Sequence, residues 1–211
     1  MDVVIVGAGG HGRETLHCIR RASVDGSLRV LGIADDRQPS GESLDRLERI
    51  DIGWLGPVES FRHVPVYLGI GNGIVRCKLN EVMTSAPPVV DPSAVVGDDV
   101  RLDWGSIVFA QATVTTNVRL GRHTHIGRGA AVGHDCTLED GVSVMPLASI
   151  SGDVSIGKGA FVGTGALIRQ GVRIGAAATI GMGAVVLEDV PDAVTVVGNP
   201  ARVLGKPRHT D

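Results

Sequence analysis

Residues 126–163 read IGRGAAVGHDCTLEDGVSVMPLASISGDVSIGKGAFVG, with an aliphatic residue at every sixth position from Ile126 to Val162. The same spacing continues in both directions, from Val90 to Val186, and all 17 positions hold Val, Leu or Ile. Since these three types make up 60 of the 211 residues, chance gives such a run with a probability on the order of 10⁻⁹. The position four residues later always holds a small or slender side chain. A short period with alternating large and small inward positions predicts a stacked β-solenoid.

The composition indicates a soluble, cytoplasmic protein. A formal net charge of −3 argues against nucleic acid as the main partner. No charged and apolar leader opens the chain, and no apolar run approaches the ~18 residues that span a membrane. The three cysteines, Cys18, Cys77 and Cys136, are scattered and lack metal-ligand spacing. We therefore expect no membrane, no nucleic acid and no metal among the partners.

The first 86 residues do not follow the six-residue rule, so we expect a domain over 1–86 and the solenoid over 87–211. Apolar runs predict strands over 3–6, 28–34 and 65–70, with helices over 13–21 and from 73 to about 83. Strands that alternate with helices predict half of a doubly wound α/β sheet.

Gly7, Gly9 and Gly12 fit the pattern G-x-G-x-x-G, and Asp35 follows the second strand, where a dinucleotide fold carries its ribose acid. NAD binding is the weaker interpretation, because the domain is long enough for only one of the two halves of a dinucleotide fold. Another is a turn whose glycines serve only tight packing. A third fits better: a helix N-terminus behind a glycine-rich turn attracts phosphate, which suits the diphosphate of a sugar nucleotide.

Four motifs occur in a characteristic order: G-A-G-G-H-G at 7–12, D-D at 35–36, I-G-N-x-x-x-R at 70–76 and G-H-D-C at 133–136. Together they resemble the NeuD/PglD group of sugar acyltransferases, over essentially the whole chain. The resemblance implies a Rossmann-like half domain that holds a sugar nucleotide. It also implies a left-handed parallel β-helix of about six coils, with acetyl-CoA lying along it.

The resemblance also implies roles for single residues. The catalytic base of the family matches His134. Relatives often carry Glu before this histidine and Asn in the preceding hexad, where this chain has Gly133 and Gly127, so the details of acceptor recognition differ. Candidate contacts to the sugar nucleotide are Gly9, Gly10, His11, Asp35, Asp36 and Asn72. Candidate contacts to acetyl-CoA are Gly152, Thr164, Met182, Pro200 and Arg202, with Lys206 as an alternative partner for a CoA phosphate.

The residue before each aliphatic position points outward, and these residues sort into three faces. One face is basic or polar: Arg101, Arg119, Thr137, Ser155 and Arg173. The second holds Val95, Thr113, Ala131, Ser149, Leu167 and Val185, and the third holds Ile107, His125, Ser143, Phe161 and Thr179. Two weakly polar faces predict two surfaces buried against partner subunits. Two different patches that meet head to tail close into a ring, and the family's ring is a trimer with active sites between subunits.

His134 falls at the corner between the Ala131 face and the basic face, hence at the mouth of a subunit cleft. Gly152 lies 18 residues later, which places it one coil above, about 5 Å along the axis. Imidazole suits proton removal near neutrality, and the Gly152 N–H is a candidate oxyanion donor. Asp135 either orients the ring or is a solvated turn acid.

These inferences predict an acetyl-CoA-dependent N-acetyltransferase that acts on a nucleotide-linked amino sugar. The alternatives are an O-acetyltransferase of a sugar or sialic acid, and a non-catalytic scaffold that binds a sugar nucleotide. His123, His125 and His134 resemble the zinc ligands of γ-class carbonic anhydrases only in residue type, because their spacings of 2 and 9 do not match.

Overall fold

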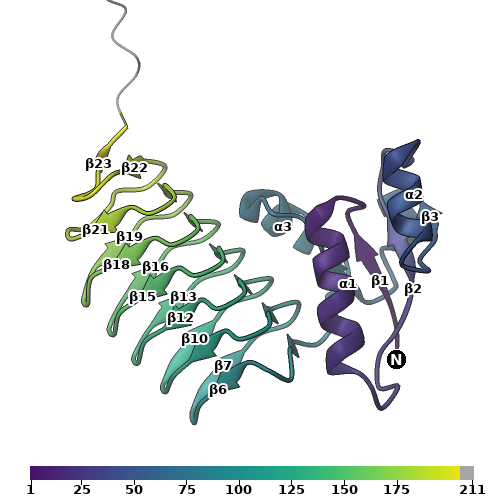
Figure 1. Cartoon of the computed structure of the whole chain (residues 1–211), viewed down its shortest axis with the longest axis horizontal. Helices are drawn as coiled ribbons and strands as arrows, with labels where there is room; N and C mark the ends of the chain where they lie inside the picture. Colours follow the sequence, from purple (N-terminus) through teal and green to yellow (C-terminus); the bar gives the residue numbers. More distant parts are fainter. Residues whose placement is uncertain (205–211) are drawn as a thin grey trace, which may run out of the picture.

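The computed structural model describes residues 1–204, with an α/β domain at one end of a long β-helix (Figure 1). In chain order the α/β domain contains β1 (Asp2–Val6), α1 (Gly10–Ala22), β2 (Arg29–Ala34), α2 (Glu42–Glu48), β3 (Trp54–Gly56), a 3₁₀ helix (Val58–Phe61), β4 (Val66–Leu68) and α3 (Gly73–Asn80). Its strands form a parallel sheet in the order β3-β2-β1-β4. Within residues 1–204, no helix is both long and apolar enough to cross a membrane.

The β-helix has three faces. The face that we call the covered face contains β5 (Val89–Val90), β8 (Ile107–Val108), β11 (His125–Ile126), β14 (Ser143–Val144), β17 (Phe161–Val162), β20 (Thr179–Ile180), β22 (Thr195–Val197) and β23 (Arg202–Val203). The open face contains β6 (Val95–Val96), β9 (Thr113–Val114), β12 (Ala131–Val132), β15 (Ser149–Ile150), β18 (Leu167–Ile168) and β21 (Val185–Val186). The basic face contains β7 (Val100–Leu102), β10 (Val118–Leu120), β13 (Thr137–Leu138), β16 (Ser155–Ile156) and β19 (Arg173–Ile174).

The six-residue period sets this architecture. Strands pair in parallel with a register of 18 residues, as in His125 with Ser143 and Ala131 with Ser149. From Val108 to Val186 every sixth side chain is buried in a single core, together with the small residues between them. The predicted fold is confirmed.

The coils turn at corners where the backbone is left-handed. Asn117, Asp135 and Asp153, at 18-residue spacing, have φ angles of 52°, 60° and 57°. Asn and Asp tolerate this conformation better than other residues with a Cβ. This corner therefore carries short polar side chains in successive coils, next to one another.

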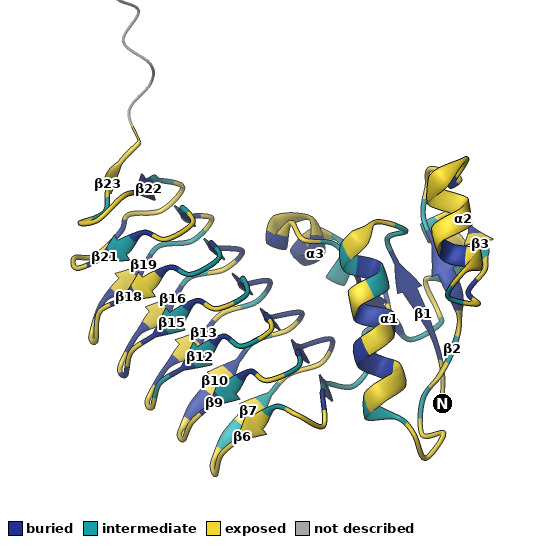
Figure 2. Ribbon diagram, in the orientation of Figure 1, coloured by how far each residue is buried: buried dark blue, intermediate teal, exposed yellow. Residues whose placement is uncertain are grey.

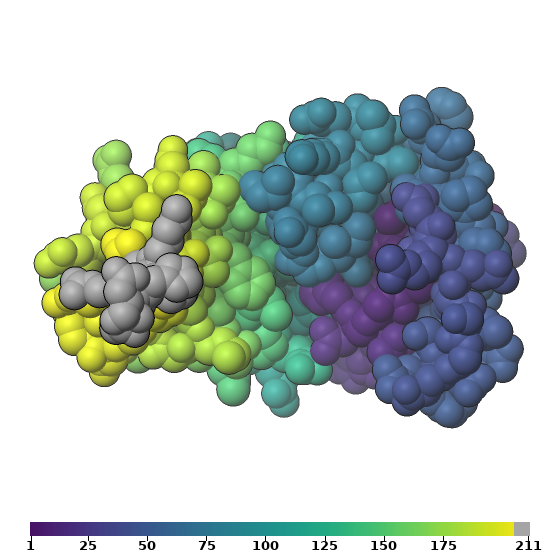
Figure 3. All heavy atoms as spheres, turned by 90° about the horizontal axis from the view of Figure 1, so that it is seen from above, coloured from purple at the N-terminus to yellow at the C-terminus, as the bar shows by residue number. Residues whose placement is uncertain are grey.

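The α/β domain packs against the covered face of its own chain, as the space-filling view shows (Figure 3). Arg76 of α3 is fully buried and donates to His123 O at 3.0 Å, Gly141 O at 2.9 Å and Ser143 Oγ at 3.0 Å. On the other side of the contact, Arg21 of α1 pairs with Asp91 at 2.7 Å. These interactions fix α1 and α3 on the first coils.

The prediction that both weakly polar faces are buried against partner subunits is wrong for the covered face. Ile107, His125 and Ser143 are buried by the chain's own α/β domain, because the apolar side of α1 and the Arg76 guanidinium complement that face. The open face remains uncovered (Figure 2), with Val95 62% and Leu167 48% exposed. One apolar face, not two, is free for a partner.

Candidate active site

His134 lies at the corner between the open and basic faces, which we call the His134 corner. The backbone stacks directly there, since Asp135 N donates to Thr116 O at 3.2 Å and Asp153 N donates to His134 O at 2.8 Å. The His134 side chain is 53% exposed. Its ring is therefore held on a rigid coil and still accessible to a substrate.

Asp135 contacts the His134 ring, with Oδ2 2.6 Å from Nδ1. Its other oxygen, Oδ1, accepts from Asn117 Nδ2 at 2.6 Å. The Asn117 amide, and then His134, lower the pKa of the Asp135 carboxyl. Because a carboxylate only accepts hydrogen bonds, this contact favours the neutral tautomer of His134 with the proton on Nδ1 and the lone pair on Nε2.

Gly152 lies against the His134 ring, one coil further along the β-helix. A Cβ built at Gly152 would lie 2.5 Å from Nε2 of His134, so any side chain there would displace the imidazole. The Gly152 N–H donates no hydrogen bond among residues 1–204. The structure thus brings the three predicted catalytic residues, His134, Asp135 and Gly152, together at one corner.

The glycines of the first βα turn serve two purposes. A Cβ at Gly12 would collide with the Gly7 carbonyl, so these two glycines allow close packing. Gly9 has no neighbour within 4 Å of a built Cβ, and Gly10 has only Arg13 Nη2 at 3.8 Å. α1 begins at Gly10, three residues before the predicted start, and no side chain caps it. The open glycines leave a helix N-terminus that can bind an anion.

The other predicted sugar-nucleotide residues carry structural hydrogen bonds. Asp35 accepts from Ala8 N at 2.8 Å and Arg37 N at 2.9 Å, which holds the glycine-rich turn in place. Asp36 accepts from Val58 N at 2.9 Å, and Asn72 caps α3 by accepting from Val75 N at 3.1 Å. Asp36 and Asn72 are exposed, so both keep acceptor capacity for a ligand.

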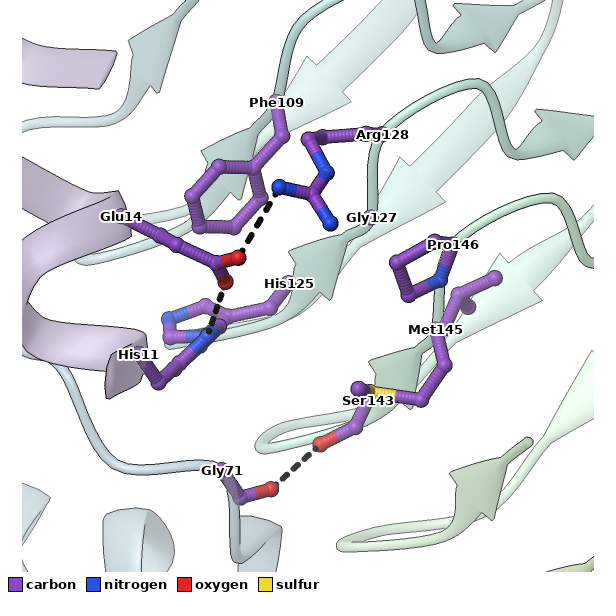
Figure 4. Close-up of a pocket in the computed structure, with 11 residues that line it drawn as sticks. His11, Glu14, Gly71, Phe109, His125, Gly127, Arg128, Ser143, Met145 and Pro146 are labelled. Atoms are coloured by element: carbon purple, nitrogen blue, oxygen red, sulfur yellow. Dashed lines mark hydrogen bonds and ion pairs between the residues drawn. The ribbon is translucent and has the colours of Figure 1, made fainter. Parts of the chain in front are cut away.

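His11 closes a narrow pocket between the turn and the β-helix (Figure 4). Its Nε2 lies 2.8 Å from His125 Nδ1, and its Nδ1 lies 3.5 Å from Glu14. Glu14 in turn pairs with Arg128 at 3.0 Å across the pocket mouth. Phe109, Met145 and Pro146 complete the apolar wall. The pocket combines a cation, a carboxylate, a helix N-terminus and an apolar surface.

The two histidines near Arg76 are buried and neutral. Burial, followed by the Arg76 charge, lowers the pKa of His123 to about 4 and that of His125 well below its usual value. His123 Nε2 contacts Ser85 Oγ at 2.9 Å, whereas His134 lies at a different corner of the β-helix. The three histidines of the zinc alternative do not converge, and within residues 1–204 no cluster of three or more metal-binding side chains occurs.

The predicted acetyl-CoA residues occupy two edges of the open face. Thr164 and Met182 follow Arg128 and Pro146 in one column, at the corner between the covered and open faces. We call this the Arg128 corner. Gly152 lies at the His134 corner instead. Pro200 and Arg202 are exposed beside β23, which closes the last coil, and Lys206 lies outside the described residues.

Within one chain the two candidate half-sites are therefore apart. The glycine-rich turn and the His11 pocket adjoin the Arg128 corner, and His134 adjoins the other edge of the open face. Sequence reasoning did not include Asn117, Glu14 or Arg128 among the candidates. Asn117 was detectable, because it lies 18 residues before Asp135; Glu14 and Arg128 depend on how the domains dock.

Family models match both parts of the chain. The PglD N-terminal domain matches residues 2–83, the bacterial transferase hexapeptide (six repeats) matches 135–170, and the hexapeptide repeat of succinyl-transferase matches 153–188. A comparison with curated protein sequences found no match.

Solved structures match over nearly the whole chain. The acetyltransferase domain of PglB from Neisseria gonorrhoeae, in complex with acetyl coenzyme A, is 30% identical, with a TM-score of 0.84 over 96% of this chain and 98% of that one. PerB from Caulobacter crescentus, in complex with CoA and GDP-perosamine, is 31% identical, with a TM-score of 0.83 over 97% and 98%. A His-to-Asn mutant of perosamine N-acetyltransferase from the same organism, with the same two ligands, is 29% identical, with a TM-score of 0.84 over 98% of each chain.

Proposed function

This chain belongs to the NeuD/PglD-type family of hexapeptide-repeat sugar acyltransferases, and we propose that it transfers an acetyl group from acetyl-CoA to the amine of a nucleotide-linked amino sugar. The observation that carries the proposal is the His134 corner. An exposed imidazole whose Nδ1 contacts the Asp135 carboxylate lies against a glycine whose N–H donates no hydrogen bond within residues 1–204. Acyl transfer needs this pairing of a base and an oxyanion donor.

The reaction follows from these groups. The neutral amine attacks the thioester carbonyl, and Nε2 of His134 removes the amine proton as the C–N bond forms. The Gly152 N–H donates to the oxyanion of the tetrahedral intermediate. When the intermediate collapses, the C–S bond breaks and the sulfur takes the proton back from the imidazolium. The products are the N-acetylated sugar nucleotide and CoA.

The acceptor side of the proposal rests on the glycine-rich turn. The free amides at Gly9, Gly10 and His11 suit a diphosphate at the N-terminus of α1, and Arg13 and Arg128 lie beside Gly10 in one groove. Asp36 and Asn72 are the groups that we expect to contact the base or ribose, while Asp35 shapes the turn. A free monosaccharide would leave this domain without a purpose.

The separation of the two half-sites favours a ring of three copies. If the open faces of three chains point toward a common axis, the His134 corner of one copy meets the Arg128 corner of the next. The partly exposed Leu167 and Val185 of each open face are then buried. Each active site would combine the base of one chain with the glycine-rich turn of its neighbour. Acetyl-CoA would then contact residues of both chains.

A thiol-release assay with acetyl-CoA tests the function. The assay compares UDP-, dTDP- and GDP-linked amino sugars with the free amino sugars and with hydroxyl-only sugar nucleotides as controls. We expect CoA release and an amide product with one of the linked amino sugars. Release with a hydroxyl acceptor alone would indicate an O-acetyltransferase, and tight nucleotide binding without any release would indicate a non-catalytic scaffold.

A further inference from the structure

The His134 ring depends on a residue outside the candidate catalytic set. Asn117 lies one coil before Asp135, at the equivalent left-handed position of the same corner. Its Nδ2 is 2.6 Å from Asp135 Oδ1, and Asp135 Oδ2 is 2.6 Å from His134 Nδ1. The three side chains form one hydrogen-bonded chain that links two coils.

We propose that Asn117 is a positioning residue, which holds Asp135 so that His134 keeps its proton on Nδ1 and its lone pair on Nε2. The inference rests on the proposed function only where it makes His134 the base. Asn117 itself need not touch either substrate.

The need for Asn117 follows from exposure. Asp135 is 51% exposed, and an ion pair or hydrogen bond on a surface is weak because water competes and both side chains can rotate. A second partner on Oδ1 restricts that rotation and favours the rotamer of Asp135 in which Oδ2 faces the ring. The same bond is the largest cause of the lowered pKa of Asp135, so the carboxylate stays an acceptor and the shared proton stays on the imidazole.

The neighbours of Asn117 in its column support a specific role. The equivalent positions one coil before and two coils after Asn117 are Asp99 and Asp153, with φ of 54° and 57°. Aspartate thus satisfies the backbone at this corner, but it cannot donate to Asp135 and would repel it. Among these four stacked residues, the single amide donor adjoins the single carboxylate that contacts the imidazole.

Nitrogen-15 NMR of the imidazole rings tests the inference independently of activity. The full-length protein is labelled at histidine, and the His134 signals are assigned by their loss in His134→Ala. In mildly alkaline buffer we expect wild type to show protonated Nδ1 and unprotonated Nε2. Asn117→Gly, which keeps the left-handed backbone, should show a mixture of both tautomers. Asp99→Gly is the matched control, and its His134 signals should equal those of wild type.

Kinetics give the second readout. We expect kcat of Asn117→Gly to fall roughly tenfold, with an unchanged KM for acetyl-CoA, and Asn117→Asp to fall at least as far. An unchanged tautomer in Asn117→Gly would overturn the inference, as would an unchanged kcat in an enzyme shown to be active. A tautomer change in a protein that never releases CoA would uphold the positioning role and refute the proposed function instead.

Discussion

The β-helix carries histidines in two places, and the fold treats them in opposite ways. His134 lies on an open corner, with one ring nitrogen on Asp135 and the other accessible above Gly152. His125 lies on the covered face, 3% exposed, between His11 and the Arg76 charge. One ring can accept a proton from a substrate, whereas burial keeps the other neutral and inaccessible.

The difference teaches that position on the prism, and not residue type, decides the role. Both histidines occur in hexads of the same pattern. The α/β domain of the same chain packs on the covered face, so the polar residues of that face lie in an internal contact. The His134 corner lies away from this domain and keeps an exposed imidazole.

The exposed histidine should show the largest effect. His134→Ala is expected to lower kcat by ~10²–10⁴, because it removes the general base, with little change in the affinity for acetyl-CoA. The pH–rate profile should lose its acidic limb. His63→Ala, another exposed histidine, is the control. If His134→Ala kept more than about a tenth of wild-type activity, another group would be the base. The contrast between an exposed catalytic His134 and a buried His125 would then be wrong.

The next effect concerns the open face. Leu167→Arg or Ala131→Arg should dissociate the ring, because a charge would be buried at the contact between copies. Activity should fall roughly tenfold or more along with the assembly. Light scattering and activity are measured together, with Thr137→Arg on the basic face as control. A wild-type protein that is monomeric at micromolar concentration would contradict this prediction.

The glycine-rich turn should affect only one substrate. Gly10→Glu is expected to raise KM for the sugar nucleotide roughly tenfold, since its carboxylate would occupy the anion site at the helix N-terminus. KM for acetyl-CoA should not change. Gly10→Gln has a side chain of the same size without the charge, so it separates the steric effect from the electrostatic one. Gly53→Glu, at an exposed glycine, is the control for folding. Equal efficiency on an amino sugar with and without its nucleotide would refute the assignment.

The buried histidines should affect stability. Their folded pKa values lie below those of the unfolded chain, so the unfolded state binds more protons once the pH falls below about 6.5. The free energy of unfolding is highest above that pH and decreases as the pH falls toward 4, the lowered pKa of His123. Each ring contributes a slope of about 1.4 kcal/mol per pH unit.

Urea unfolding between pH 7.5 and 4.5 measures that slope. His123→Asn should reduce it by about one proton, and His63→Ala should not. The Arg76 charge lowers the pKa of His11, His123 and His125. The carboxylates act in the opposite direction: Glu14 raises the pKa of His11, and Asp103 raises that of His123. A stability that does not depend on pH in this range would show that the rings are already exposed.

Much of the structure was predictable from the spacing. The 18-residue coil predicts that Gly152 lies next to His134, because stacked strands repeat at about 4.8 Å. The same spacing puts Asn117 one coil before Asp135, but it does not show that the two side chains share a hydrogen bond. The short strand β3 is not predictable, because its three residues, Trp54–Gly56, show no alternation.

The docking of the α/β domain could not be predicted. It depends on Arg76, which donates to the carbonyls of His123, Gly141 and Val142 in the coils. Every residue has a carbonyl, so the sequence does not show which of them accept from Arg76. For the same reason the sequence assigned the covered face to a partner subunit. Asp35 matches a ribose-binding acid by position, yet its oxygens accept from the backbone amides of Ala8, in the glycine-rich turn, and of Arg37.

In the proposed trimer, each active site joins the His134 corner of one chain to the glycine-rich turn of the next. Mixed trimers of His134→Ala and Gly10→Glu chains, co-expressed with different tags, test this directly at a low sugar-nucleotide concentration. In a random mixture about a quarter of the clefts receive both intact halves, so activity should rise to about a quarter of wild type. Activity no higher than the mean of the two variants would show that both halves of the site come from one chain.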